Sequence, residues 1–209
     1  MDIARLKDVD RAYPTALKSY LGHEAPSSLA ALGNLDILKQ NKLALFCSVK
    51  CPGKLILQAH DLARELAEAE VTVVSGFHSP VEKECLRILL RGPQPVVICP
   101  ARSLKKMRLW TEWKKPLEEE RLLFLSPFPD NRHRGDTKMA VYRNRFVAAL
   151  ADKIFVAYAA PSSKTEQFCR ETLGWGKTLY TIESDINSGL VAMGARPLSG
   201  NGRFDISKG

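Results

Sequence analysis

Short apolar runs alternate with helical patterns along most of this chain, and this alternation is the strongest constraint on its fold. Continuous apolar runs, as opposed to runs that alternate with polar residues, are typical of strands buried on both faces of a parallel sheet. The 209-residue chain is long enough to bury one large domain of this kind. The predicted strands are Leu43–Cys47, Val71–Val74, Val96–Cys99, Arg121–Leu125, Ile154–Tyr158 and Thr178–Ile182.

Helical patterns fill most of the intervals between these strands. In Lys54–Ala69 apolar residues recur every three or four positions along one face, as in an amphipathic helix. The other predicted helices are Pro80–Arg91, Thr137–Ala151, Ser163–Leu173 and Asp185–Gly194. The alternation predicts an α/β fold with a Rossmann-like, doubly wound, mostly parallel sheet of about six or more strands and helices on both faces. We expect this domain at residues 41–198, a lead-in packed on it at 1–40, and a flexible tail at 199–209.

The formal net charge of +8 is distributed unevenly. Residues 91–115 hold seven Lys and Arg against one acid, and residues 132–145 hold five against one. Such clusters suit a polyanionic partner such as nucleic acid, although many mildly basic domains bind none. No apolar run could span a bilayer and the N-terminus lacks a signal-peptide core, so we expect a cytoplasmic protein without a membrane partner. The five cysteines are expected to be reduced thiols.

The Arg143-Asn144-Arg145 triplet is the most informative motif for function. We expect it to open a helix, which leads into the strand Ile154–Tyr158 and then into the hydroxyl-rich turn Pro161–Thr165. Guanidinium groups match phosphate oxygens in pairs, and a turn that feeds a helix N-terminus offers free backbone N–H groups. The pattern predicts a phosphate site, with solvated helix residues as the alternative interpretation.

Two further strand ends fit the same site, because the carboxyl ends of parallel strands lie at one edge of the sheet. Cys47–Lys54 carries small residues and two lysines, and Ser75–Pro80 carries small residues before a helix. Neither a dinucleotide fingerprint nor a P-loop is present, which disfavours NAD binding and ordinary NTPase activity. The residues predicted to contact DNA or nucleotide phosphates and bases are Ser48, Lys50, Gly53, Ser75, Gly76, Tyr142, Arg143, Arg145, Ser163, Lys164 and Thr165.

No catalytic constellation can be argued from spacing, so we predict no catalytic residue, no cofactor and no metal site. His78 and Glu82 could transfer protons, but a helix-start acid beside a capping histidine is the favoured interpretation. Cys47 and Cys51 could hold a metal with a histidine, but the usual second half-site is missing. Four aromatic residues near the basic clusters form either a base-stacking platform or a hydrophobic lid: Trp110, Trp113, Phe124 and Phe128.

The chain resembles the Rossmann-like domain of the DNA-processing protein A family (DprA, also called Smf). The specific matches are Arg143–Leu150, which is close to the family's RNRiIagLs block, and Asn187–Ala195, which is close to its n.GLI..GA ending. More generic matches are Tyr13-Pro14, Leu32–Leu38, Leu43–Gly53, Val73–Gly76, Ser163–Thr165 and Gly176-Lys177. The resemblance implies binding of single-stranded DNA in DNA processing, transformation or recombination, and leaves a recombinase partner and a homodimer as possibilities.

The chain departs from the family pattern at several positions. Val49 stands where the family's Gly-Ser-Arg motif has its arginine, with Lys50 next to it as a substitute. Pro80 replaces a glycine and Glu82 replaces an aspartate. The chain continues only briefly beyond the last matching block, so we expect no winged-helix module.

A second resemblance gives the alternative function. The lysine-decarboxylase-like phosphoribohydrolases, which cleave nucleoside monophosphates, carry an arginine and a glycine-rich loop that Pro161–Glu166 echoes loosely. A nucleotide hydrolase of this kind would need Glu166 near a sugar. A nucleotide-sensing domain is the third class left open.

Overall fold

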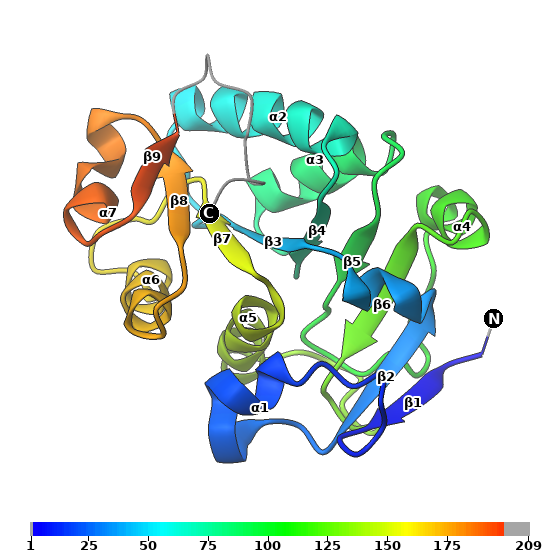
Figure 1. The fold of residues 1–209 in the computed structure, drawn as a ribbon. Coiled ribbons are helices and arrows are strands. Elements are labelled where there is room, and N and C mark those ends of the chain that lie inside the picture. Colours follow the sequence, from blue (N-terminus) through cyan, green and yellow to red (C-terminus); the bar gives the residue numbers. More distant parts are fainter. Residues whose placement is uncertain (1, 199–209) are drawn as a thin grey trace.

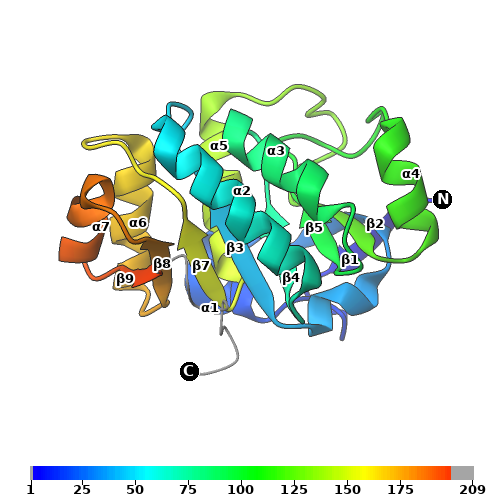
Figure 2. The ribbon, with the colours of Figure 1, turned by 90° about the horizontal axis from the view of Figure 1, so that it is seen from above.

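The computed structural model describes residues 2–198, which form a nine-stranded sheet with helices on both faces (Figures 1 and 2). The spatial order is β1-β2-β6-β5-β4-β3-β7-β8-β9. The strands are β1 Ala4–Lys7, β2 Ser28–Gly33, β3 Lys42–Phe46, β4 Thr72–Ser75, β5 Val96–Ile98, β6 Leu122–Ser126, β7 Lys153–Val156, β8 Leu179–Ile182 and β9 Arg196–Leu198. Every pairing from β6 to β9 along this order is parallel, whereas β1 and β2 pair antiparallel beyond β6. The predicted α/β class and parallel sheet are confirmed.

The helices are α1 Ala16–Leu21, α2 Gly53–Glu68, α3 Pro80–Leu89, α4 Thr111–Glu118, α5 Thr137–Leu150, α6 Lys164–Gly174 and α7 Ser188–Ala192. Helices α2 and α3 cover one face of the sheet, and α1, α5 and α6 cover the other (Figures 1 and 2). Three short 3₁₀ turns complete the described part: η1 Gly22–Glu24, η2 Leu35–Lys39 and η3 Asp185–Asn187. Within residues 2–198 no helix is long and apolar enough to cross a bilayer.

Several predicted boundaries need correction. The Arg143–Arg145 triplet lies in the middle of α5, because the Asp136 carboxylate caps this helix by accepting a hydrogen bond from the Met139 N–H (2.8 Å). The predicted helix Asp185–Gly194 is split into η3 and α7. Strands β1, β2 and β9 were missed, and the tail predicted at 199–209 lies outside the described residues.

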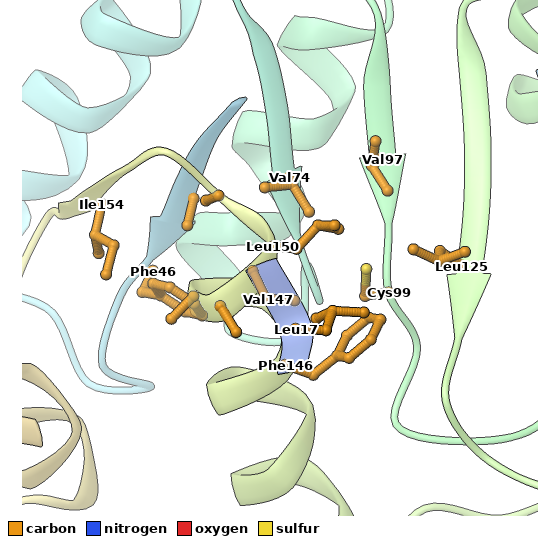
Figure 3. Packing of buried hydrophobic residues seen from close by; sticks show 14 of the residues in the cluster. Leu17, Phe46, Val74, Val97, Cys99, Leu125, Phe146, Val147, Leu150 and Ile154 are labelled. Carbon is orange, nitrogen blue, oxygen red and sulfur yellow. The ribbon is translucent and has the colours of Figure 1, made fainter. Parts of the chain in front are cut away.

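The central strands are apolar throughout because each face of the sheet carries its own core. In β3, Leu43 and Leu45 join the core under α2 and α3, whereas Ala44 and Phe46 join the core under α5. Figure 3 shows the second core, where Phe146 of α5 packs near Cys99 and Leu17. Packing in the two cores fixes the position of each strand along its own direction. It therefore also fixes the position of the carboxyl end of the strand.

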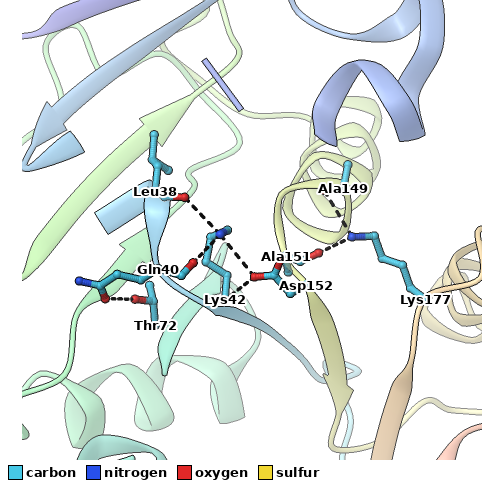
Figure 4. A network of polar contacts seen from close by, with 8 residues as sticks. All are labelled: Leu38, Gln40, Lys42, Thr72, Ala149, Ala151, Asp152 and Lys177. Atoms are coloured by element: carbon cyan, nitrogen blue, oxygen red, sulfur yellow. Dashed lines mark hydrogen bonds and ion pairs between the residues drawn. The ribbon is translucent and has the colours of Figure 1, made fainter. Parts of the chain in front are cut away.

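The buried side chain of Lys177 contacts the carboxyl end of α5 (Figure 4). The Lys177 ammonium donates to the carbonyl oxygens of Ala149 and Ala151, and it lies 4.0 Å from the centroid of the Tyr20 ring. The carbonyls at the end of a helix have no partners within the helix, so a cation there is favourable. Nearby, Lys42 pairs with Asp152 (3.4 Å) across the start of β3 and β7.

We expect Lys177 to make stability depend on pH. Burial lowers the pKa of Lys177 from 10.5 to about 8, so between these values the unfolded chain holds a proton that the folded protein has released. Stability from this group therefore rises as pH increases across that window. In urea unfolding, the stability of the wild type relative to Lys177→Met should increase from pH 7 to pH 10; a constant difference would contradict this account.

Candidate nucleic-acid interface

The sheet has a switch point between β3 and β7. From β3 the chain builds outward through β4, β5 and β6 on one side, and then returns to place β7, β8 and β9 on the other. Connections leave the carboxyl ends of β3 and β7 in opposite directions, which opens the crevice where ligands bind in folds of this kind. Ser48 lies at this switch point and is buried: its N–H donates to the Tyr158 carbonyl (2.9 Å) and its Oγ accepts from the Ala160 N–H (3.1 Å).

The N-terminus of α2 opens beside Ser48. Its capping position is Pro52, and no side chain within the described residues caps it. Gly53, the first helical residue, faces open space. Lys50 and Lys54 are exposed, and neither forms an ion pair with a described residue. An uncapped helix start with two unpaired ammonium groups is suited to an anion, because both the N–H groups and the helix dipole favour negative charge.

The β7–α6 turn supplies the opposite wall of the crevice. Ser163 caps α6, since its Oγ accepts from the Glu166 N–H (3.2 Å), and the Glu166 carboxylate accepts in turn from the Ser162 N–H (3.1 Å). Glu166 is therefore engaged in capping, and its position gives no support to a sugar-directed catalytic role. Lys164 is exposed and unpaired within residues 2–198.

Arg145 lies in a separate hollow of about 260 Å³ between α5 and α6, whose lining includes Lys164 and Thr165. Its guanidinium is already paired, at 2.6 Å with Glu24 and at 2.7 Å with Glu171. The structure thus brings three of the predicted residues together, but the charge of Arg145 is largely neutralised before any ligand arrives.

Arg143 is a buried residue, with a side chain only 4 % exposed. Its Nη1 donates to the Cys99 carbonyl (3.1 Å) and its Nε to Asn144 Oδ1 (2.8 Å). The guanidinium lies flat against Gly76, where any Cβ would collide with it. Burial lowers the pKa of Arg143, and guanidinium groups keep their proton in proteins.

The two arginines therefore do not form one clamp, which corrects the expectation from the sequence. Residues two apart on a helix point to different sides, so Arg143 and Arg145 cannot face the same ligand. Ser75 and Gly76 join Arg143 in its buried setting: Ser75 is fully buried and its Oγ accepts from the Phe77 N–H (3.1 Å). These three residues shape the end of β4.

The aromatic residues considered for base stacking also differ in how far they are buried. The Tyr142 hydroxyl donates to the Glu24 carbonyl (2.6 Å), and its ring packs edge-on against Phe128 (5.9 Å between centroids). Phe124 is fully buried and Phe128 nearly so, whereas Trp110 is 59 % exposed. Only the tryptophans remain as candidates for stacking with a base.

Glu82 is the residue whose importance the sequence reasoning understated. This buried carboxylate accepts hydrogen bonds from the N–H groups of Cys47 (2.9 Å), His78 (2.7 Å) and Ser79 (3.2 Å). With Ser79 it completes a capping box at the start of α3, so Glu82 is a helix-start acid as expected, but the capping residue is Ser79 and not His78. It also ties the end of β3, where the Ser48 turn begins, to α3.

Asn187 supports the other side of the switch point. Its amide donates to the carbonyls of Ala157 (3.1 Å) and Ile182 (3.0 Å), which follow β7 and end β8. Its Oδ1 is buried and has no hydrogen-bond partner among the described residues. Asn187 appeared in the sequence only as part of the matching C-terminal block, without a role.

A basic rim borders the crevice on the β5–β6 side. The loop after β6 is tied to the loop after β5 through the Ser103 N–H and the Arg132 carbonyl (2.8 Å). Arg132, Arg134 and Lys138 are exposed, and none forms an ion pair within residues 2–198. The charge count of residues 132–145 was the sequence signal for this rim.

The cysteines differ in reactivity. The hydrogen bond from the Cys47 thiol lowers the pKa of Cys51, whereas burial raises that of Cys85, Cys99 and Cys169 to about 12 each. Cys51 should therefore react first with iodoacetamide near neutral pH, as followed by mass spectrometry. The Cys51→Ser variant should lose this fast phase, and rapid labelling of a core cysteine in the folded protein would contradict the assignment.

Within residues 2–198 no cluster of three or more His, Cys, Asp or Glu residues could hold a metal ion.

Comparison with known proteins identifies the family of this chain. The chain matches the sequence model described as DNA recombination-mediator protein A over residues 5–201. It belongs to this family. No curated protein sequence matches the chain.

Solved structures of the family share the fold. DNA processing protein A (DprA) from Streptococcus pneumoniae is 21 % identical, with 96 % of this chain and 72 % of that chain covered and a TM-score of 0.79. DNA processing protein A from Helicobacter pylori, described as binding single-stranded DNA, is 20 % identical, with 97 % and 92 % covered and a TM-score of 0.75. A molybdenum cofactor binding protein from Rippkaea orientalis is more distant, at 9 % identity, 77 % and 88 % coverage and a TM-score of 0.53.

Proposed function

We propose that this protein binds single-stranded DNA at the carboxyl edge of its sheet, in DNA processing or recombination. Family membership and the DNA-binding Helicobacter pylori relative support the ligand. The position rests on the N-terminus of α2 beside Ser48, which no described side chain caps, and on Lys50 and Lys54, which form no ion pair with a described residue. A cytoplasmic location, a recombinase partner and a homodimer are consistent finer proposals.

In this proposal the phosphates of the strand contact the start of α2 and the exposed lysines. The N–H groups of Gly53 and Lys54 donate hydrogen bonds to one phosphate, while Lys50 replaces the arginine that the family has one position earlier. Lys164 faces the strand from the other wall of the crevice. Arg143 does not contact DNA; it holds the ends of β4 and β5 in place through Gly76 and Cys99.

The strand continues along the basic rim of Arg132, Arg134 and Lys138. These side chains are exposed and form no ion pair with a described residue, so they can neutralise phosphates without first breaking such a pair. Because each neutralised phosphate releases counterions, binding should weaken steeply as salt increases.

The test is fluorescence anisotropy with a labelled single-stranded oligonucleotide. We expect the Lys50→Ala/Lys54→Ala variant to bind about tenfold more weakly than the wild type, with a salt slope lower by about two. The control of equal charge is Lys39→Ala/Arg91→Ala, which removes two exposed cations near the opposite ends of the strands, of which Lys39 pairs with Asp36. If both double variants lose affinity for DNA equally, binding depends on general electrostatic attraction and not on the start of α2.

A further inference from the structure

A second pocket opens beyond the ends of β4 and β5, on the face that α3 and α4 cover. It has a volume of about 500 Å³ and extends from Gly76 and Phe77, after β4, to Trp110 and Trp113 at the start of α4. Gly76 thus separates this pocket from the buried guanidinium of Arg143. The pocket is continuous with the sheet edge to which DNA binding is assigned above, but lies apart from the Ser48 turn.

Three aromatic side chains in mutual contact form one wall of the pocket, from a buried ring to an exposed one. Fully buried Phe124 contacts Trp113 (5.1 Å between centroids), and Trp113 contacts Trp110 edge-on (6.2 Å). Trp110 remains 59 % exposed, although it is the largest kind of apolar side chain. An exposed indole held on a packed aromatic base is a surface on which a flat ring can stack.

The surroundings of the pocket are strongly basic. Lys83 and Arg87 of α3 contribute to its lining, together with one acid, Glu112. Residues 101–115 contain six Lys and Arg against this single acid. Lys106 and Lys114 are exposed and form no ion pair with a described residue. A ligand that suits both the aromatic wall and this rim has a flat ring and attached negative charge.

We propose that this pocket takes a base of the bound single strand, which stacks on Trp110 while the flanking phosphates lie on the basic rim. The inference rests on the proposed function and adds a base subsite to it. Acidic peptides share the charge but lack regularly spaced flat rings, so the strand is the occupant that fits both features.

The experiment compares two labelled strands of equal length and phosphate number: oligothymidylate, and a strand with abasic sites in place of the bases. For Trp110→Ala we expect about tenfold weaker binding of oligothymidylate and unchanged binding of the abasic strand, since stacking requires a base. Trp175→Phe, which alters a tryptophan that stacks on Tyr20 elsewhere, should bind both strands as the wild type does. Quenching of tryptophan fluorescence by oligothymidylate should disappear in Trp110→Ala and persist in Trp175→Phe.

The other outcomes separate the two proposals. If wild type binds oligothymidylate and Trp110→Ala binds it equally well, the base subsite is overturned. If Trp110→Ala loses affinity for both strands to the same extent, stacking is also overturned. If the wild type binds neither strand, the proposed function itself fails before any variant is compared.

Discussion

Substituting Gly76 by alanine is expected to lower the free energy of unfolding by about 3 kcal/mol, because the new methyl group must displace the buried guanidinium of Arg143. The displaced side chain loses its hydrogen bond to the Cys99 carbonyl, which is then buried without this donor. Arg143→Ala should cost a similar amount, since a charged donor is removed from a buried acceptor and from the neighbourhood of Glu82.

The double variant distinguishes this specific packing from general fragility of the region. Arg143→Ala removes the three atoms that lie nearest to the new methyl group of Gly76→Ala, so the two losses should be far from additive. Urea unfolding of the wild type, both single variants and the double variant provides the cycle. Additive losses would mean that Gly76 is required for another reason and that the contact with Arg143 carries no energy.

Loss of the Glu82 carboxylate should produce the second large effect. Glu82→Ala leaves the buried N–H of Cys47 without its acceptor and removes half of the capping box at α3, for a combined cost of about 3 kcal/mol. Glu82→Gln keeps the shape and one oxygen, so it should cost about half as much. Thermal and urea unfolding measure both.

Glu82 should also influence binding, although it touches no ligand in this account. Cys47 leads directly into the Ser48 turn, so releasing its N–H loosens the start of the crevice. We expect Glu82→Ala to weaken DNA binding at temperatures where the variant remains folded, with Glu82→Gln intermediate. Unchanged affinity in a folded Glu82→Ala protein would show that the turn is held by its contacts with Tyr158 and Ala160 alone.

The parallel core of the fold could be predicted because its strands are buried on both faces. All six predicted strands exist, with ends shifted by one or two residues, since continuous apolar runs are hard to place in any other context. The outer strands escaped prediction for physical reasons. β1 is mostly exposed and polar, β2 contains alanines and a glycine, and β9 has three residues with a proline among them.

The candidate site was harder to predict because side-chain direction depends on helix register. The Arg-Asn-Arg triplet indicated a helix with a role in binding, but its two guanidinium groups point in different directions. Arg143 points into the core, and Arg145 points to carboxylates of η1 and α6. Glu24 and Glu171 are far from the triplet in sequence, so no local pattern reveals that Arg145 is already paired. The Ser79-x-x-Glu82 capping box is a local pattern, but the sequence analysis assigned the capping role to His78.

The position of the strand on the sheet edge is tested most directly by hydrogen–deuterium exchange with and without single-stranded DNA. The account predicts slower exchange of the backbone amides at residues 48–54 and 159–165, and unchanged exchange at residues 89–95, which lie at the opposite ends of the strands. Protection confined to other regions, or none at all under conditions where DNA is bound, would contradict the assignment of DNA binding to the switch point.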